Sequence, residues 1–187
     1  MQTTKPLLVL AAVAMVALPQ AAWAQQPQSI SADKFVQTVA MSDMFEVESS
    51  KLAAGRSRHA RIKKFADHMV KDHQKTTEEL KQLLSRAKLN LPLPSSPDPE
   101  HQAMLGQLQG ATGDQFDEAY SKMQLKGHED AVALFESYSR NGDNAELKKW
   151  AIKTLPNIRQ HLAEARQLKG GATTGSSASA PRTAPQR

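Results

Sequence analysis

Residues 57–88 read SRHARIKKFADHMVKDHQKTTEELKQLLSRAK, and their apolar residues recur every three or four positions. The recurrent residues are Ile62, Phe65, Ala66, Met69, Leu80, Leu84 and Ala87. Because an α-helix turns once in about 3.6 residues, this spacing places them on one side of a helix. The segment therefore predicts a long amphipathic helix with one face turned towards a core.

Three further segments have the same periodicity, and no alternating strand pattern extends beyond a few residues. We expect these helices over residues 31–54, 114–140 and 144–168. Ser31 and Asp114 are suited to cap the N-termini of two of them. Gly55 is expected to end the first helix, and Asn141-Gly142-Asp143 to form the turn before the last.

A proline-rich connection separates the first two predicted helices from the last two. It reads LNLPLPSSPDPE over residues 89–100 and cannot be helical before Pro99, which suits the first turn of a short helix ending near Leu108. Two helical hairpins with a long connection predict an all-α fold, an antiparallel four-helix bundle with a short extra helix in the connection.

The two ends of the chain differ in composition from the helical part. Residues 1–24 have the three parts of a secretory signal: a positive charge at Lys5, an apolar run over 7–18 and the small-x-small site Ala22-Trp23-Ala24. The apolar run is shorter than the roughly 20 residues that cross a bilayer. We expect a mature chain beginning at Gln25, an extended lead-in over 25–30, a helical domain over 31–168 and a disordered Gly/Ser/Ala/Pro tail over 169–187.

Export places the expected product in the periplasm or outside the cell, either free or associated with the outer membrane, with no transmembrane segment after signal removal. The chain has no Cys, which excludes disulfides, thiolate catalysis and cysteine-metal sites. Most of its net charge of +5 arises at the chain ends, because residues 25–168 carry 20 basic and 19 acidic groups. This balance argues against nucleic-acid binding. The oligomeric state stays open.

Several polar residues fall on the predicted inward faces. Asp43 and Glu46 share a stripe with Val39 and Ala53, while His73 and His161 follow the apolar residues of their helices and His128 lies at a stripe edge. Carboxylates and imidazoles inside a bundle are what a transition-metal site requires. Buried groups that hydrogen-bond one another are the structural alternative.

Helical rise limits which of these residues can meet. Counted from a turn near Gly55, Glu46 and His73 differ in level along the helix axis by roughly 13 Å. The same count for the two last helices places His128 and His161 roughly 9 Å apart along the axis. Asp43 is nearer the level of His73. The Glu-x-x-His pairs of di-iron proteins are missing from the sequence.

The methionines and the remaining histidines are the other side chains whose chemistry suits a metal ion. Soft sulfur ligands for copper(I) are available, although methionines usually fill cores; they are Met41, Met44, Met69 and Met123. Three further histidines follow no inward stripe and are expected at the surface, namely His59, His68 and His101.

The chain resembles a family of exported bacterial proteins of unknown function with a ferritin-like bundle, often labelled predicted outer membrane proteins. The resemblance rests on Met44-Phe-Glu-Val-Glu48, Met69-Val-x-Asp-His73, His128-Glu-x-Ala-Val-Ala-Leu-Phe135 and Lys153-Thr-Leu-Pro156 with His161-Leu. It implies a ferritin-like fold, export and a set of matching polar positions: Glu46, Glu48, Asp72, His73, His128 and His161. Where the family often has a second Asp-His pair, this chain has Gly127-His128.

Three functions are compatible with these features. The leading one is a non-enzymatic bundle that binds a transition-metal ion through the inward carboxylates and histidines. The alternative is a module that binds anionic envelope components or another partner through the basic first turn, which contains Arg56, Arg58, Arg61, Lys63 and Lys64. Such charge runs are usually solvated faces. A di-metal oxidase ranks third, because its signature is missing.

Overall fold

The computed structural model describes residues 30–168, and every regular element in this range is a helix. The elements are α1 (Ala32–Arg56), α2 (Ala60–Arg86), α3 (Pro99–Gly110), α4 (Gly113–Asn141) and α5 (Ala145–Leu168). The predicted all-helical fold is confirmed, including a short helix in the long connection. The expected signal segment, most of the lead-in and the tail lie outside the described residues. Within residues 30–168, no helix is both long and apolar enough to cross a membrane.

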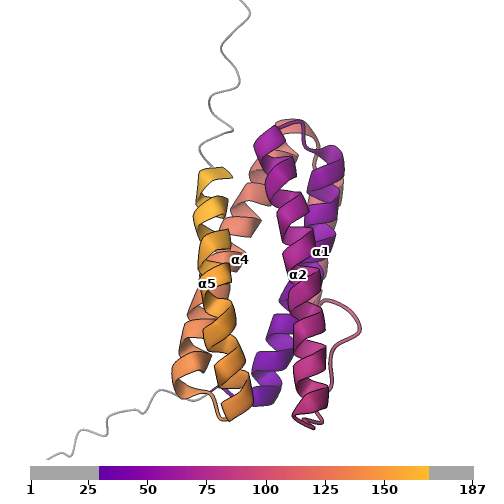
Figure 1. The fold of residues 1–187 in the computed structure, drawn as a ribbon. Coiled ribbons are helices and arrows are strands. Elements are labelled where there is room, and N and C mark those ends of the chain that lie inside the picture. The colour runs from indigo at the N-terminus through magenta and orange to yellow at the C-terminus, as the bar shows by residue number, and fades with distance from the viewer. Residues whose placement is uncertain (1–29, 169–187) are drawn as a thin grey trace, which may run out of the picture.

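The four long helices form two closely packed pairs. Helix α1 packs along α2, and α4 packs along α5 (Figure 1). The pairs meet through contacts of α1 with α4 and of α2 with α5, while α3 packs mainly on α1. This arrangement brings side chains from α1, α2, α4 and α5 into a shared interior.

The helix ends follow the sequence with two corrections. Ser31 is the N-cap of α1, as expected, and its Oγ accepts a hydrogen bond from the Lys34 amide at 3.3 Å. Gly55 does not end α1, which continues to Arg56 because the chain leaves the helix through the extended backbone of Ser57. Asp114 is not a cap either, since α4 already begins at Gly113 and the aspartate lies in the first turn. There its charge still complements the helix N-terminus.

Two apolar clusters form the core, at different levels along the helices. The first includes Phe35, Val36, Leu80, Leu84, Phe135, Tyr138, Leu147 and Trp150. The second includes Ala53, Ile62, Phe65, Met69, Leu108, Phe116, Tyr120 and Leu168. Between these sets in the sequence of α1, α4 and α5 lie buried polar residues, among them Asp43, Glu46, Gln124, His128 and His161, and α2 contributes the partly buried His73. The interior therefore has a polar layer as well as an apolar core.

Candidate metal centre

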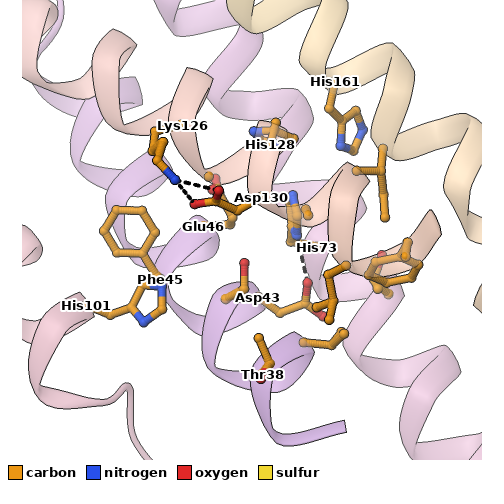
Figure 2. A pocket seen from close by; sticks show the side chains of 18 of the residues that line it. Thr38, Asp43, Phe45, Glu46, His73, His101, Lys126, His128, Asp130 and His161 are labelled. Carbon is orange, nitrogen blue, oxygen red and sulfur yellow. Dashed lines mark hydrogen bonds and ion pairs between the residues drawn. The ribbon is translucent and has the colours of Figure 1, made fainter. Parts of the chain in front are cut away.

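Three histidines from three helices meet in the polar layer. His73 comes from α2, His128 from α4 and His161 from α5, and Figure 2 shows their rings beside one another. The ring centroids of His73 lie 5.8 Å from His128 and 5.5 Å from His161, and those of His128 and His161 are 5.5 Å apart. One nitrogen of each ring lies within 4.8 Å of the others. His128 and His161 are each 2 % exposed.

Each of the three rings is fixed through one nitrogen. His73 Nδ1 hydrogen-bonds Asp43 Oδ1 at 2.8 Å, and His161 Nε2 hydrogen-bonds Asp72 Oδ2 at 3.0 Å. His128 Nδ1 lies 2.8 Å from the carbonyl oxygen of Gln124, which can only accept, so this nitrogen donates. A neutral imidazole that donates through one nitrogen carries a lone pair on the other. The hydrogen bonds therefore leave lone pairs on the second nitrogens of all three rings.

Those second nitrogens have no hydrogen-bond partner among the described residues. They are His73 Nε2, His128 Nε2 and His161 Nδ1, and all are buried. A buried polar atom without a partner costs about 1–3 kcal/mol. A cation bound between the three rings would satisfy these nitrogens by accepting their lone pairs.

The spacing of the nitrogens fits a metal ion. Metal–imidazole bonds of about 2.0–2.1 Å hold any two nitrogens on one ion no more than about 4.2 Å apart. The upper separation of 4.8 Å between the histidine nitrogens requires only small side-chain rotations to reach this range. Metal-binding histidines commonly donate their other N–H to a carboxylate or a carbonyl. Asp43, Asp72 and Gln124 occupy those positions here.

The three histidines differ in their protonation. Burial lowers the pKa of His161 to about 4, helped by the charge of His73, and burial likewise lowers the pKa of His128. Burial also opposes the charged form of His73, but the hydrogen bond and the charge of Asp43 outweigh it and raise the pKa of this ring. His128 and His161 are therefore neutral near pH 7, as metal binding requires, while a proton competes for His73.

A cavity of about 420 Å³ opens onto the three histidines. Its wall also includes Phe45 and Glu46 of α1, His101 and Met104 of α3, and Lys126 of α4, several of which are visible in Figure 2. A ligand held by the histidines would thus face a space large enough for a small molecule.

A protein-family model matches residues 17–168, and its description is "Domain of unknown function (DUF4142)". The chain belongs to the DUF4142 family. The expected resemblance to a family of unknown function is thereby confirmed. None of the curated proteins matches the chain significantly.

Solved structures of a protein called CopM have a similar fold. Its Cu(II)-bound form matches with a TM-score of 0.63 and 17% identity, over 75% of this chain and 96% of that chain. Its Cu(I)-bound form matches with a TM-score of 0.63 and 17% identity, over 78% of this chain and 99% of that chain. An Ag-bound form matches with a TM-score of 0.61 and 16% identity, over 76% of this chain and 97% of that chain. At this identity the likeness concerns the fold.

The DUF4142 chain brings most of the expected polar residues together, but in different positions relative to the three rings. Glu46 lines the same cavity as His73, His128 and His161. Asp43 and Asp72 lie one hydrogen bond behind the rings, and both oxygens of Asp43 are engaged, one by His73 and one by the Thr77 hydroxyl at 3.0 Å. Glu48 is exposed and lies with Met44 and Lys51 along a separate shallow groove.

The expected 9 Å offset between His128 and His161 is wrong. The connection between α4 and α5 spans residues 142–144, so its midpoint is near residue 143 and the two histidines differ by only about 4.5 Å in helical rise. The midpoint between α1 and α2 is likewise near residue 58 and not at Gly55, which reduces the offset between Glu46 and His73 to about 4.5 Å. An error of a few residues in the expected position of each turn therefore gave too large an axial offset between residues that line one cavity.

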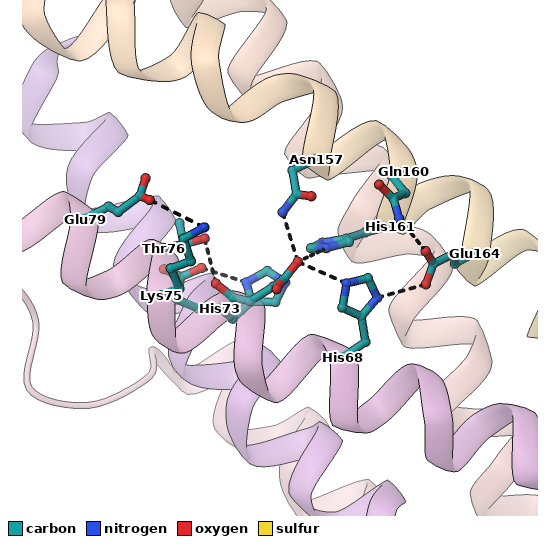
Figure 3. Close-up of polar contacts among 11 residues, drawn as sticks. His68, His73, Lys75, Thr76, Glu79, Asn157, Gln160, His161 and Glu164 are labelled. Carbon is teal, nitrogen blue, oxygen red and sulfur yellow. Dashed lines mark hydrogen bonds and ion pairs between the residues drawn. The ribbon is translucent and has the colours of Figure 1, made fainter.

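His68 was expected at the surface, but it is half-buried and joins the network behind His161. Its Nε2 lies 3.2 Å from Asp72 Oδ2, and its Nδ1 lies 3.1 Å from Glu164 Oε2 (Figure 3). Asn157 donates to the same Asp72 oxygen at 3.0 Å. The spacing of His68 four residues before Asp72 is the sequence signal that could have revealed this contact.

Two methionines belong to the apolar core, and a third lines the cavity that contains the three histidines. Met69 is fully buried in the second apolar cluster, and Met123 packs against that cluster. Met104 lines the cavity, but its thioether was not among the expected ligands. Met69 and Met123 thus fill the core, as methionines usually do.

Two residues of the basic first turn hold other helix ends. Arg56 Nη1 donates to the carbonyl oxygens of Leu108 at 3.3 Å and Gln109 at 2.9 Å. Arg61 Nη1 donates to the carbonyl oxygen of Gln167 at 3.0 Å. The others, Arg58, Lys63 and Lys64, are exposed. Binding of anionic envelope material through this turn stays a prediction.

Proposed function

We propose that this DUF4142 protein binds one transition-metal ion through His73, His128 and His161, and that binding, not catalysis, is its activity. The proposal includes an antiparallel, ferritin-like four-helix arrangement of the long helices, in which facing helices supply the ligands. Asp43, Asp72 and the Gln124 carbonyl orient the three rings. The bound ion would supply a Lewis-acidic charge that holds the three lone pairs together.

One observation carries the proposal: three neighbouring imidazoles, two buried and one partly buried, offer nitrogens within 4.8 Å of one another. Each ring has one nitrogen held by an acceptor and one nitrogen without a partner. In a purely structural network we would expect the rings to donate to or accept from one another. Lone pairs on neighbouring nitrogens repel one another, and a cation bound between them removes that repulsion. The imidazole donor set suits copper, zinc, iron and nickel.

The comparisons support the proposal at the level of the fold. CopM, which has a similar helical structure, has been solved with Cu(II), Cu(I) and silver bound. A fold of this kind can therefore hold transition metals, and the histidines of this chain offer a place for one.

The proposal also includes export. A signal over residues 1–24 and a mature chain from Gln25 would deliver the bundle to the periplasm or the exterior, where it is either free or associated with the outer membrane. Mass spectrometry of the protein isolated from the periplasm tests this part, and an intact Met1 would contradict it.

Metal analysis of mature protein purified without a histidine tag tests the central claim. Titration calorimetry with Cu(II) and Zn(II), combined with elemental analysis, should give one ion per chain. His73→Gln, His128→Gln and His161→Gln should each lower the affinity at least as much as the 10–100-fold typical for loss of an outer-shell partner.

The matched control is His101→Gln, which removes another histidine from the wall of the same cavity and should leave the affinity within about twofold. Equal affinity in all four variants would show that the three histidines do not hold the ion. No binding by the wild type would reject the proposed function.

A further inference from the structure

Glu46 is a buried carboxylate without a complete set of partners. It lies on α1, is 2 % exposed and lines the cavity that contains the three histidines. Its Oε2 has no hydrogen-bond partner among the described residues. A buried charge in this condition is costly unless an opposite charge lies nearby. The carboxylate is therefore arranged for a cation.

Gly127 makes room for this carboxylate. A Cβ atom at position 127 would lie 3.3 Å from Glu46 Oε1, closer than most real Cβ contacts. A glycine inside a helix is about 1 kcal/mol less favourable than alanine, and here the missing side chain lets Glu46 lie against α4. Gly127 directly precedes His128, so the carboxylate lies against the turn of α4 that carries one of the three histidines.

Asp43 and Lys126 of the cavity wall have partners, while Glu100 of the same wall is exposed. Asp43 accepts from His73 and Thr77. Lys126 pairs with Asp130 on the surface of α4. Glu46 lines the cavity together with His73 and His128. Among these groups, Glu46 is the buried carboxyl that has an oxygen without a partner.

We infer that Glu46 gives the metal centre a preference for divalent ions over monovalent copper and silver ions. This inference rests on the proposed function, because it concerns an ion held by the three histidines. The energy of an ion in the field of a fixed charge is proportional to the charge of the ion. A carboxylate beside neutral imidazoles therefore stabilises a divalent ion about twice as much as a monovalent one.

The chemistry of the available donor atoms also favours a divalent ion. Copper(I) and silver(I) favour soft sulfur ligands, whereas imidazole with carboxylate suits divalent ions. Met69 belongs to the second apolar cluster and Met123 packs against it, while Met104 is the methionine that lines the cavity. The centre thus combines three nitrogens with a negative charge.

Calorimetry of the full mature protein with Zn(II) and Ag(I), in chloride-free buffer, tests the inference. In Glu46→Gln, which keeps size and polarity, the Zn(II) affinity should fall at least tenfold, and the Ag(I) affinity by only about the square root of that factor. Glu48→Gln, the same substitution at an exposed position two residues away, should leave both affinities within about twofold. Gly127→Ala, which displaces the carboxylate but keeps its charge, should weaken Zn(II) binding to a smaller extent than Glu46→Gln.

The outcomes separate the two proposals. If Glu46→Gln lowers the affinities for Zn(II) and Ag(I) by the same factor, or lowers neither, the role of Glu46 is overturned. If His128→Gln abolishes binding in the same experiment, the metal centre itself is still supported. If the wild type binds neither ion, both proposals fail.

Discussion

The first apolar cluster and the polar layer are built from the same long helices, yet their side chains are satisfied to different degrees. In the cluster, Phe35 stacks on Tyr138 with ring centroids 3.9 Å apart and meets Phe135 and Trp150 edge-on. In the layer, the three histidines and Glu46 leave buried atoms without partners. The cluster contains one such atom, Trp150 Nε1. One level of the interior thus stabilises the fold, and the other contains polar atoms that lower its stability.

This contrast leads to a ranking of substitutions. A large loss of unfolding free energy is expected where packing is complete, and small or even favourable changes where polar groups are unpartnered. With metal bound, substitutions in the polar layer should lower the free energy of unfolding strongly, because the ion supplies the missing partner of the polar groups. Each prediction below tests one part of this contrast.

The largest effect is expected from Phe35→Ala in the apolar cluster. Phe35 is 0 % exposed and contacts three aromatic rings, so its truncation should lower the free energy of unfolding by about 3–5 kcal/mol. Urea unfolding of metal-free protein measures this, with Ile152→Ala, at a residue 58 % exposed, as the control. A loss below about 1.5 kcal/mol in Phe35→Ala would show that this cluster is not the main source of stability.

The next effect concerns the metal-loaded polar layer. An ion that binds only the folded state should raise the free energy of unfolding by about 2.7 kcal/mol at 100 times its Kd. The increase should be missing in His128→Gln and present in His101→Gln. Urea unfolding with and without Zn(II) is the measurement, and an equal increase in both variants would place the ion elsewhere.

Acid should destabilise the metal-free protein through the same layer. The pKa of His161 is lowered to about 4, whereas in the unfolded chain it is near 6.5. The unfolded state therefore takes up the proton first, and stability falls as the pH drops from about 6.5 to 4. His128 acts in the same direction, while the raised pKa of His73 contributes stability that is lost as the pH rises through it.

His161→Gln should remove about 1–3 kcal/mol of this acid-dependent loss. Urea unfolding at several pH values between 4 and 8 measures it for both proteins. Parallel pH profiles of wild type and variant would mean that His161 is not held neutral in the folded state.

The smallest effect is expected from His128→Leu without metal. This change removes an unpartnered nitrogen, and the Gln124 carbonyl keeps its bond within α4, so stability should stay the same or rise by up to about 1 kcal/mol. Thermal unfolding of metal-free protein tests it. A loss above about 2 kcal/mol would indicate that the imidazole has a structural role.

Much of the fold was accessible from the sequence because it depends on local pattern. The period of Ile62, Phe65 and Met69 predicted α2, and Ser31 predicted the start of α1 correctly. The inward positions of Asp43, Glu46, His128 and His161 also followed from periodicity, and all four are buried. The turns were less predictable, because the end of a helix depends on contacts such as those of Arg56 with the end of α3.

The sequence by itself determined which residues face inward, since a helical repeat assigns each side chain an angle around its own axis. It did not determine which inward residues meet, because that depends on the level at which each helix passes its neighbour. Only the tertiary structure placed His73, His128 and His161 at one level and His68 behind them. It also showed that the missing side chain of Gly127 leaves room for the carboxylate of Glu46. The physical reason is that a shift of a few residues in a turn moves a side chain by several ångströms along the axis, more than the length of a metal–ligand bond.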